Sequence, residues 1–325
     1  MAWDDILGQS LAKQVLQTHL ADGRVAGAYL LVGPDGVGKR RLAMEMARAL
    51  NCVGSGARPC DACLVCSQIG RGVHPDVHLL LPGGPADQIK IDDVRHLLGR
   101  IALRPFSAAT QVAVIDGAER LTEEAANGLL KALEEPSART RFLLTTVRFT
   151  RCLPTIVSRC QVIRCAPLSS DAVKRILVEQ QGCEVAIAEA VARLAGGSAS
   201  RAIELASRWA AHQQLCAHLA NDAPSAWLEQ PLPETREGVA QLVDGMTAWL
   251  RDLAVTAAAD ADRAVHAGHA DALRRQALAV DLDQCLSTAV ELMALRESLE
   301  QFVSPRLVAS LAREKWLALN LEAGS

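Results

Sequence analysis

The feature that most constrains the fold is an apolar run that ends in a glycine-rich loop and continues into a helix. Residues 29–32 read YLLV, and GPDGVGK follows at residues 33–39. Residues 41–50 then repeat apolar side chains at helical spacing. Glycines let a backbone approach phosphates closely, and a helix N-terminus directs N–H groups at the anion. This order of elements predicts a phosphate-binding loop in an α/β fold.

The loop has most of the residues that hold a nucleotide, but it lacks one of them. Gly33, Gly36 and Gly38 shape the loop, and Lys39 is placed to reach the outer phosphates. The hydroxyl that usually follows the lysine and binds Mg²⁺ is absent, because the next residue is Arg40. A guanidinium has no lone pair to offer a cation. A glycine turn without ligand is also consistent with this sequence, so whether ATP or ADP occupies the loop stays open.

A second apolar run shows a matching loss. Residues 111–116 read QVAVID and predict a buried strand that ends in Asp116. In ATPases of this type the Asp helps hold Mg²⁺, and a Glu directly after it polarises the attacking water. Here Gly117 takes that position, and Glu119 is expected to face away. With the metal-binding hydroxyl and the water-activating carboxylate both absent, the chain is not expected to hydrolyse ATP itself.

Further apolar runs complete the expected sheet. Residues 141–146 and 161–164 predict two more strands. Between the second and third strands lies a helix pattern, with Thr122 as its N-cap and Pro136 as its stop. Strands that alternate with helices predict a parallel sheet covered on both faces.

After Pro167 the sequence becomes helical throughout. Aromatic residues make up only 3% of the chain, so cores must be built from Ala, Leu and Val. Residues 223–233 predict a connection with little regular structure. We therefore expect three domains: an α/β domain at 1–167, a small helical domain at 168–207 and a larger helical domain at 208–325.

The C-terminal region carries apolar residues at helical spacing. These side chains need neighbours, either within the domain or in another subunit. They are Leu282, Leu286, Val290, Met293, Leu307 and Leu311.

Four of the ten cysteines lie close together, at Cys52, Cys60, Cys63 and Cys66. The chain shows no secretory leader and no stretch of ~18 apolar residues, so we expect a cytoplasmic protein without membrane contact. In a reducing compartment, metal binding is favoured over free or disulfide-bonded cysteines. Four thiolates suit a structural Zn²⁺ site with no open position, so nearby His74 is not needed as a ligand.

The remaining six cysteines are scattered along the chain. We expect them to be small buried apolar residues. They are Cys152, Cys160, Cys165, Cys183, Cys216 and Cys285.

The motifs LLKALEEP, FLLTT and IVSRC follow the phosphate loop in order. Together they resemble bacterial DNA polymerase III clamp-loader subunits of the AAA+ class, and the departures at Arg40 and Gly117 resemble the delta-prime type. The resemblance covers the whole chain and is strongest over residues 1–165. It implies a P-loop-type sheet domain with a zinc module at 52–66, a helical lid domain and a C-terminal helical collar domain.

The same resemblance implies partners. Family members form a five-subunit ring that opens the sliding clamp onto primed DNA. The implied partners are the gamma/tau motor subunits, the delta subunit and the rest of the polymerase III holoenzyme.

The resemblance also assigns roles to residues. Arg159, in Ser158-Arg159-Cys160, would act in trans in the ATP site of a neighbouring subunit. A planar guanidinium can bridge γ-phosphate oxygens and stabilise developing charge. The alternative is an ordinary salt bridge. Thr146, or else Thr145, corresponds to a γ-phosphate sensor at a strand end, although Thr also suits any strand.

Two further motifs depart from or only weakly match the family. In GGSASRA the arginine of a second sensor is shifted by one residue, so that Ser200 takes its place and Arg201 follows. Near the start, Trp3 and residues 6–9 resemble a segment that lines an adenine pocket, although plain packing explains them equally well.

Contact with DNA would need a local basic surface, because the net charge is −3. Arg95, Arg100 and Arg104 fall in a helical stretch that faces the central channel in the family. Contacts there would reach phosphates without reading sequence. A solvated basic face is the alternative.

Two main functions remain. The first is a non-hydrolysing stator subunit of the clamp loader, a component of the polymerase holoenzyme that supplies Arg159 to a motor subunit. The alternative is an active AAA+ motor subunit. A stand-alone zinc protein with a decayed nucleotide fold is a third possibility, and a retained Arg159 counts against it.

Overall fold

The protein divides into two compact units in a computed structural model. One unit comprises Met1–Gly182 with Ala195–Ala202, and the other comprises Cys183–Leu194 with Ile203–Ser325. The predicted three-domain division stays a prediction. The structure describes residues 3–84, 86–221, 227–228, 231–259, 264–299 and 303–319. The expected connection at 223–233 and an Ala-rich stretch near Asp260 lie mostly outside these described residues.

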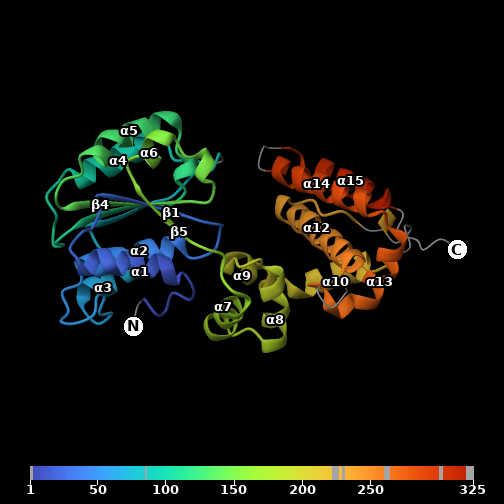
Figure 1. The fold of residues 1–325 in the computed structure, drawn as a ribbon. Helices are drawn as coiled ribbons and strands as arrows, with labels where there is room; N and C mark the ends of the chain where they lie inside the picture. The colour runs from blue at the N-terminus through green and yellow to red at the C-terminus, as the bar shows by residue number, and fades with distance from the viewer. Residues whose placement is uncertain are drawn as a thin grey trace. The chain divides into compact units, whose positions relative to one another are not determined.

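The first unit is built on a five-stranded parallel sheet with the order β2-β3-β4-β1-β5 (Figure 1). The strands are β1 (Ala28–Val32), β2 (Val77–Leu80), β3 (Gln111–Ile115), β4 (Thr140–Thr146) and β5 (Gln161–Arg164). Leu30 of β1 lies opposite Leu144 of β4 on one side and Val162 of β5 on the other. Four strands match the sequence predictions, and β2 was not predicted.

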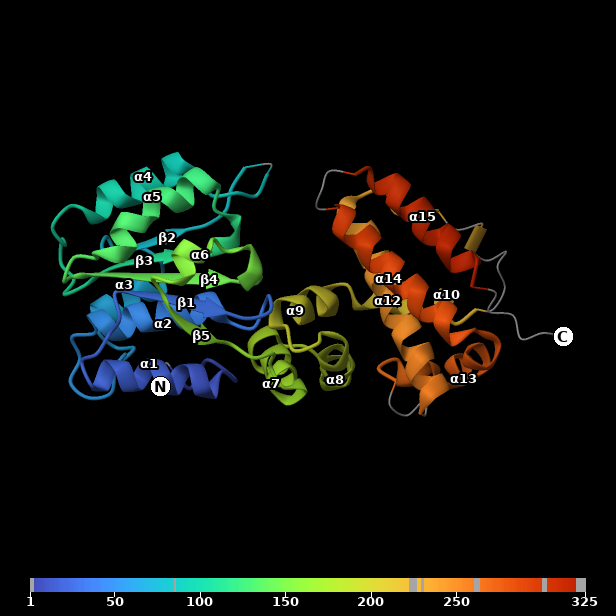
Figure 2. The same ribbon diagram turned by 45° about the horizontal axis from the view of Figure 1, so that its top comes forward.

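Helices cover both faces of this sheet (Figures 1 and 2). One face carries α1 (Ser10–Ala21), α2 (Lys39–Asn51) and α3 (Leu64–Gly70). The other carries α4 (Ile91–Ile101), α5 (Glu123–Glu134) and α6 (Pro154–Val157). Successive strand residues point to opposite faces, so Tyr29 and Leu31 join one core and Leu30 joins the other. The prediction of a parallel sheet buried on both faces is confirmed.

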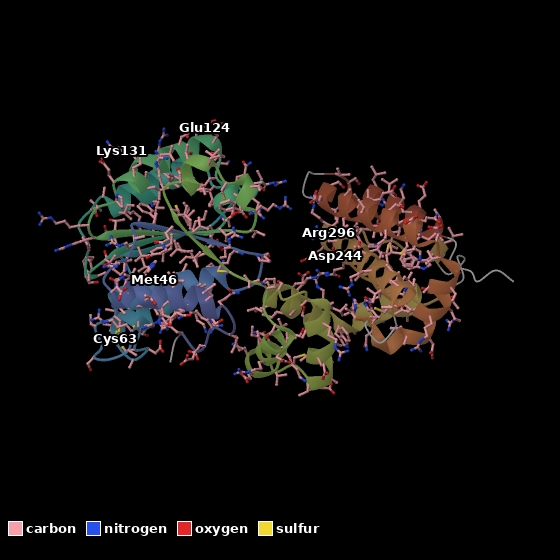
Figure 3. All side chains as sticks on the ribbon, viewed as in Figure 1. Met46, Cys63, Glu124, Lys131, Asp244 and Arg296 are labelled. Atoms are coloured by element: carbon pink, nitrogen blue, oxygen red, sulfur yellow. The ribbon has the colours of Figure 1, made fainter. Side chains whose placement is uncertain are left out.

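Helix α5 shows how local sequence sets an element. The Thr122 side chain accepts a hydrogen bond from the Ala125 N–H at 3.3 Å, which is the predicted N-cap. The helix ends at Glu134, two residues before Pro136. Glu124 and Lys131 lie on its outer side (Figure 3).

Short elements complete the first unit. They are the 3₁₀ turns η1 (Ala118–Arg120) and η2 (Phe149–Arg151), α7 (Ser170–Arg175), its π-helical continuation η3 (Ile176–Gln180) and the first residues of α9 (Ala199–Ser207).

The second unit is helical. Its helices are α8 (Val185–Leu194), α10 (Trp209–Leu219), α12 (Arg236–Ala258), the 3₁₀ turn η5 (Ala267–His269), α13 (Ala270–Ala279), α14 (Leu282–Ser298) and α15 (Pro305–Leu317). The long helix α12 packs against α10, α13, α14 and α15, with Trp249 and Leu250 fully buried. Asp244 of α12 pairs with Arg296 of α14 at 3.4 Å (Figure 3).

The apolar row that the sequence predicts on α14 does not face this core. The row consists of Leu282, Leu286, Val290 and Met293, and every member is exposed, with Val290 at 61%. The helix instead buries Cys285, Thr288 and Leu292. The sequence predicted that this row would pack within its own domain or against another subunit. The core of the second unit does not cover it.

Among the described helices, none combines the length and the apolar character needed to span a bilayer.

Candidate nucleotide site, arginine finger and cysteine cluster

The phosphate loop lies at the carboxyl edge of the sheet, between β1 and α2. Gly36 and Gly38 have φ of 71° and 96°, a left-handed conformation that glycine adopts without strain. Gly33 is required for another reason, since a Cβ there would lie 2.2 Å from the carbonyl oxygen of Cys165. The loop therefore has the backbone form that its glycines predict.

Lys39 begins α2 and is buried. Its Nζ donates a hydrogen bond to the carbonyl oxygen of Pro34, at 2.6 Å, so the side chain folds back onto the loop. Burial lowers the pKa of Lys39, and the negative charges of Asp35, Asp116 and Glu119 oppose that shift.

Arg40 reaches across the edge of the sheet to Asp116. Its guanidinium lies 3.2 Å from Asp116 Oδ2. The other carboxylate oxygen, Oδ1, accepts a hydrogen bond from the Thr145 hydroxyl at 2.5 Å, and Thr145 in turn accepts from the Gly117 N–H at 3.1 Å. A cationic side chain thus contacts the carboxylate that would help hold Mg²⁺ in an active site of this type.

The structure separates the two threonines proposed as the γ-phosphate sensor. Thr145 contacts Asp116, whereas the Thr146 hydroxyl accepts hydrogen bonds from the Arg148 N–H and the Cys152 thiol. Adjacent strand residues point to opposite faces, so the two hydroxyls cannot both face the site. Thr145 is thus the threonine beside the acidic residue, and the assignment of Thr146 as the sensor stays a prediction.

Gly117 and Glu119 define the turn that follows Asp116. Gly117 has a φ of 86°, which a glutamate would adopt only with strain. Glu119 does not face away as expected, because its Oε1 accepts from the Val147 N–H at 3.2 Å, directly after β4. Among the described residues, its buried Oε2 has no hydrogen-bond partner.

The start of α9 packs against the phosphate loop. The Ala199 N–H donates to the Gly36 carbonyl oxygen at 2.9 Å. A Cβ on Gly36 would meet Ser198 Oγ at 2.2 Å and Ser200 Cβ at 2.9 Å. Ser200 thus lies against the loop without offering a guanidinium, and Arg201 is exposed.

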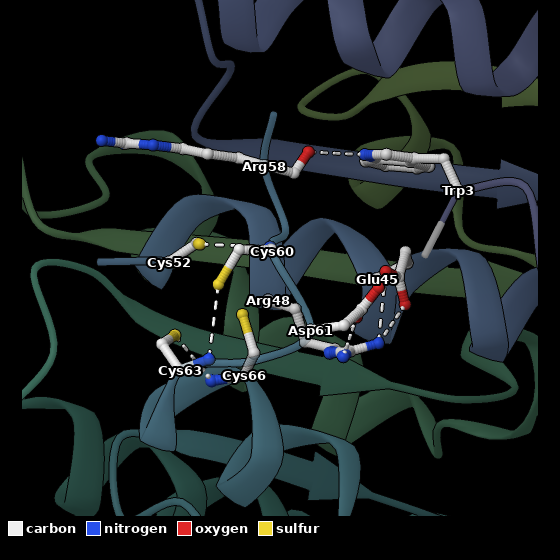
Figure 4. Close-up of polar contacts among 9 residues, drawn as sticks. All are labelled: Trp3, Glu45, Arg48, Cys52, Arg58, Cys60, Asp61, Cys63 and Cys66. Carbon is white, nitrogen blue, oxygen red and sulfur yellow. Dashed lines mark hydrogen bonds and ion pairs between the residues drawn. The ribbon is translucent and has the colours of Figure 1, made fainter. Parts of the chain in front are cut away.

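The segment near the N-terminus contains Gln9, which the sequence analysis included in residues 6–9 without giving it a role of its own. Gln9 is buried, and its amide donates to the carbonyl oxygens of Val37 and Ala166 at 3.1 and 2.6 Å. Its φ of 54° is an unusual conformation for a residue other than glycine, and nothing in the motif at residues 6–9 predicted it. Trp3 is buried and donates from Nε1 to the Arg58 carbonyl oxygen at 2.9 Å, so it packs against the cysteine loop (Figure 4).

Arg159 follows α6 and is partly exposed, at 28% of its side chain. Its guanidinium pairs with Glu134 at the end of α5, with Nε at 2.8 Å from Oε1. It also donates to the Thr155 carbonyl oxygen at 2.9 Å. In this single chain, Arg159 is therefore held by a salt bridge at the surface of the sheet unit.

Cys52, Cys60, Cys63 and Cys66 converge, with their sulfurs all within 4.8 Å of one another (Figure 4). Backbone N–H groups of Cys60, Cys63 and Cys66 each donate to a preceding sulfur of the group, at 3.3–3.4 Å. Burial alone would raise the pKa of Cys63, but hydrogen bonds from backbone N–H groups lower it to about 6. Four convergent sulfurs with N–H groups directed at them fit a bound Zn²⁺.

An ion-pair network anchors this cysteine loop to α2 (Figure 4). Arg48 donates to Glu45 Oε2 at 2.9 Å and also pairs with Asp61 in the loop. Burial raises the pKa of Glu45, against the effect of the nearby Arg48. These contacts make the cysteine loop a fixed part of the sheet unit.

His74 is buried and lies outside the four-cysteine group, as expected. Among the other cysteines, Cys152, Cys165, Cys216 and Cys285 are buried. The prediction is wrong for Cys160 and Cys183, which are only half-buried.

The arginines proposed to contact DNA lie on or just after α4. Arg95 is exposed and pairs with Asp92 at 3.2 Å, an i,i+3 contact on the helix surface. Arg100 and Arg104 are exposed as well. Their exposure is consistent with phosphate contact and equally with a solvated face.

Comparisons with known proteins bear on identity. The profile of the family described as DNA polymerase III, delta subunit, matches residues 8–169. The DNA polymerase III subunit delta' of Bacillus subtilis (strain 168) is 36% identical over 172 residues, which are 53% of this chain and 52% of that protein. The tau subunit of Escherichia coli (strain K12) is 34% identical over 207 residues, 62% of this chain and 32% of that protein.

These matches span about half the length of the first relative and a third of the second. A solved structure of a DNA polymerase III gamma subunit-related protein from Thermotoga maritima is 18% identical, with a TM-score of 0.48, and covers 94% of this chain and 99% of that one. Through its residues 8–169, the chain belongs to the DNA polymerase III clamp-loader family.

Proposed function

We propose that this chain is a non-hydrolysing, delta-prime-type subunit of the DNA polymerase III clamp loader. It would supply Arg159 in trans to the ATP site of a neighbouring motor subunit during replication in the cytoplasm. The observation that carries the proposal is the contact of Arg40 with Asp116 at 3.2 Å.

That contact opposes metal binding through charge. Asp116 would have to leave the Arg40 guanidinium to help hold Mg²⁺, and the positive guanidinium would remain close to the divalent cation. An exposed ion pair of this kind stabilises the fold by only about 0–1 kcal/mol, so its importance lies in its position. Without Mg²⁺ the developing charge on a γ-phosphate has no metal to neutralise it.

Two further residues support the absence of hydrolysis. Gly117 stands where the water-activating Glu would be, and its φ of 86° disfavours any other residue. Ser200 packs at the phosphate loop where the family has an arginine. Whether ATP or ADP still binds at Lys39 is a separate question, since the glycine loop itself is intact.

Arg159 fits the role of a trans-acting finger in position and exposure. It lies at the surface, where a salt bridge to Glu134 and a hydrogen bond to the Thr155 carbonyl oxygen hold it. When a neighbouring subunit presents a triphosphate, the guanidinium can exchange one carboxylate for several phosphate oxygens. Planar, bidentate contacts with such oxygens are the strength of arginine.

Assembly with gamma/tau and delta subunits would use the C-terminal unit as a collar. The exposed apolar row on α14 gives that unit a surface suited to another subunit's helices. Primed DNA would be met by the assembled ring, with Arg95, Arg100 and Arg104 as candidates for phosphate contact. The four-cysteine cluster would hold a structural Zn²⁺, which cross-links the cysteine loop and takes no part in catalysis.

The alternative is an active motor subunit. It is favoured by the intact loop glycines, by the placement of Lys39 and by the similarity to a tau subunit. It requires that Arg40 release Asp116 whenever a nucleotide with Mg²⁺ arrives.

The test is ATP turnover by the purified chain and by a reconstituted loader. We expect no turnover by the chain alone. In the loader, Arg159→Ala should lower ATP turnover by about 10³–10⁵-fold at the site that Arg159 completes. Motor sites that receive an arginine from other subunits should keep their turnover. Arg175→Ala, which removes an exposed arginine of α7, is the matched control and should change nothing. Turnover by the chain alone that Lys39→Ala abolishes would establish a motor instead.

A further inference from the structure

The second unit contains a cluster of metal-ligating side chains that the clamp-loader role does not use. His212, Cys216 and His266 each offer one ligand atom, and these three atoms lie within 4.8 Å of one another. This group and the four cysteines at 52–66 are the two such clusters found in the described part of the chain. We propose that His212, Cys216 and His266 form a second zinc site.

Two of the ligands are preset by one helix. His212 and Cys216 are four residues apart on α10, so their side chains lie on the same face of the helix, about one turn apart. His212 Nε2 lies 3.5 Å from Cys216 Sγ. Zinc bonds of ~2.3 Å to sulfur and ~2.0–2.1 Å to nitrogen, at a tetrahedral angle, would place those atoms about 3.6 Å apart. The pair already has the separation that a shared Zn²⁺ requires.

The third ligand comes from the turn between α12 and α13. His266 is buried, and its Nδ1 lies 2.8 Å from Asp252 Oδ2 on α12. The same carboxylate oxygen accepts from the backbone N–H of His266 at 2.8 Å. This fixes the tautomer, with the proton on Nδ1 and the lone pair on Nε2. Within the described residues, that buried Nε2 has no hydrogen-bond partner.

An arrangement of this kind is typical of metal-bound histidine. A metal-ligating imidazole usually donates its other N–H to a carboxylate, which orients the ring and raises its basicity. Asp252 is itself held by Arg251, at 2.9 Å, and is almost fully buried. His266 Nε2 is therefore buried, its ring is oriented by Asp252, and its lone pair has no donor among the described residues. These are the properties of a nitrogen that binds a metal ion.

The donor set indicates the metal. Two imidazoles and one thiolate suit Zn²⁺, with the fourth tetrahedral position left to water. The His266 ring also packs against Trp249, with ring centroids 5.4 Å apart, so the site borders the helical core. Burial raises the pKa of Cys216 to about 12, and a bound Zn²⁺ would displace the thiol proton. The ion would join α10 to the turn before α13 and thereby stabilise the second unit.

The test is zinc content per chain in the full-length protein, purified from zinc-supplemented medium. We expect two zinc ions per wild-type chain, one in His266→Gln, one in the Cys60→Ser/Cys63→Ser variant and none in the combined variant. Cys285→Ser, at a buried cysteine of the same unit outside the cluster, is the matched control and should keep two. One zinc in the wild type that disappears with Cys60 and Cys63 would overturn the proposal.

A spectroscopic measurement covers the case in which a variant folds poorly. Cobalt is added to the Cys60→Ser/Cys63→Ser protein, in which the second site alone should bind. We expect the visible absorption of tetrahedral Co²⁺ together with one thiolate-to-metal band. Asp252→Asn should weaken that binding about 10- to 100-fold, because the histidine loses its orienting carboxylate. Absence of the tetrahedral signal in protein with unchanged helical content would refute the site.

Discussion

At the scale of single residues, the candidate nucleotide site depends on pairs that no motif describes. Arg40 and Asp116 are 76 positions apart, and the motif that contains each residue does not predict that the two will pair. Together they place a guanidinium on the carboxylate that a metal would need. Arg159 and Glu134 form a comparable pair, in which a carboxylate holds the arginine that we propose as a trans-acting finger.

The first prediction concerns the shape of the Arg159 side chain. Arg159→Lys keeps the charge but loses the planar fork that can bind two oxygens at once. We expect turnover of the reconstituted loader at the affected site to fall roughly 10- to 100-fold, the equivalent of one charged hydrogen bond. Arg175→Lys is the control. Wild-type turnover in Arg159→Lys would mean that charge alone suffices and that no bidentate contact forms.

The second prediction concerns Gly54 beside the cysteine cluster. A Cβ at this position would lie 2.5 Å from Cys60 Sγ, so Gly54→Ala must displace a proposed zinc ligand. We expect zinc affinity at the cluster to drop by roughly 10- to 100-fold in a chelator competition assay. Gly99→Ala on α4 is the control, because its Cβ meets nothing within 4 Å. Equal affinities in the two variants would count against four-sulfur coordination.

At the scale of elements, α14 has one side that packs in the core and a separate apolar row that stays exposed. Its buried side joins the core of the second unit, while the row from Leu282 to Met293 remains exposed. Sequence periodicity indicated the exposed row, and the buried row has similar three- and four-residue spacing but includes the polar Thr288. Only the packing of α12 against α14 decides which row is interior.

The third prediction tests this exposed row. Val290→Asp places a charge in its centre, so binding to the other loader subunits should weaken about tenfold or more, measured by analytical ultracentrifugation. Stability of the isolated chain should stay within about 0.5 kcal/mol of wild type, since the site is exposed. Gln284→Glu adds the same charge at an exposed position on another side of α14 and should leave assembly intact. If both variants assemble as wild type does, the collar contact lies elsewhere.

At the scale of the whole molecule, acid stability depends on a buried carboxylate. Asp76 accepts hydrogen bonds from the backbone N–H groups of Phe106, Ser107 and Ala108, at 2.7–2.8 Å. Burial alone would raise its pKa, but these donors hold the pKa below the ordinary value of 3.8. The charged form is thus favoured in the folded state. Its stabilisation is complete above about pH 4 and is lost as the pH falls through the lowered folded-state pKa.

The fourth prediction follows from that sign. Asp76→Asn should lower the free energy of unfolding at pH 7 by about 1.5–3 kcal/mol, measured by urea denaturation. The difference from wild type should shrink once the pH falls below 3.8. Asp171→Asn, at an exposed position of α7, should show no such effect. A difference that is constant down to acid pH would exclude the charge of Asp76 as its cause.

The sequence by itself determined the features that depend on local order. It predicted the strand, glycine loop and helix at 29–50 and the capped helix after Thr122. It also predicted that the four closely spaced cysteines would come together. Each rests on neighbours in the chain, because backbone conformation and side-chain periodicity are set over a few residues. Strand β2 escaped prediction because it is a run of only four residues that includes the polar but buried His78.

Only the tertiary structure decided what depends on distant partners. It placed Thr145 rather than Thr146 beside Asp116 and brought Arg40 to the same carboxylate, because parallel strands end at one edge and alternate residues face opposite ways. It also brought His266 to His212 and Cys216 on α10, a grouping that no spacing in the sequence reveals. The physical reason is that such contacts depend on which strand ends and helix faces become neighbours, and packing of the whole chain sets that choice.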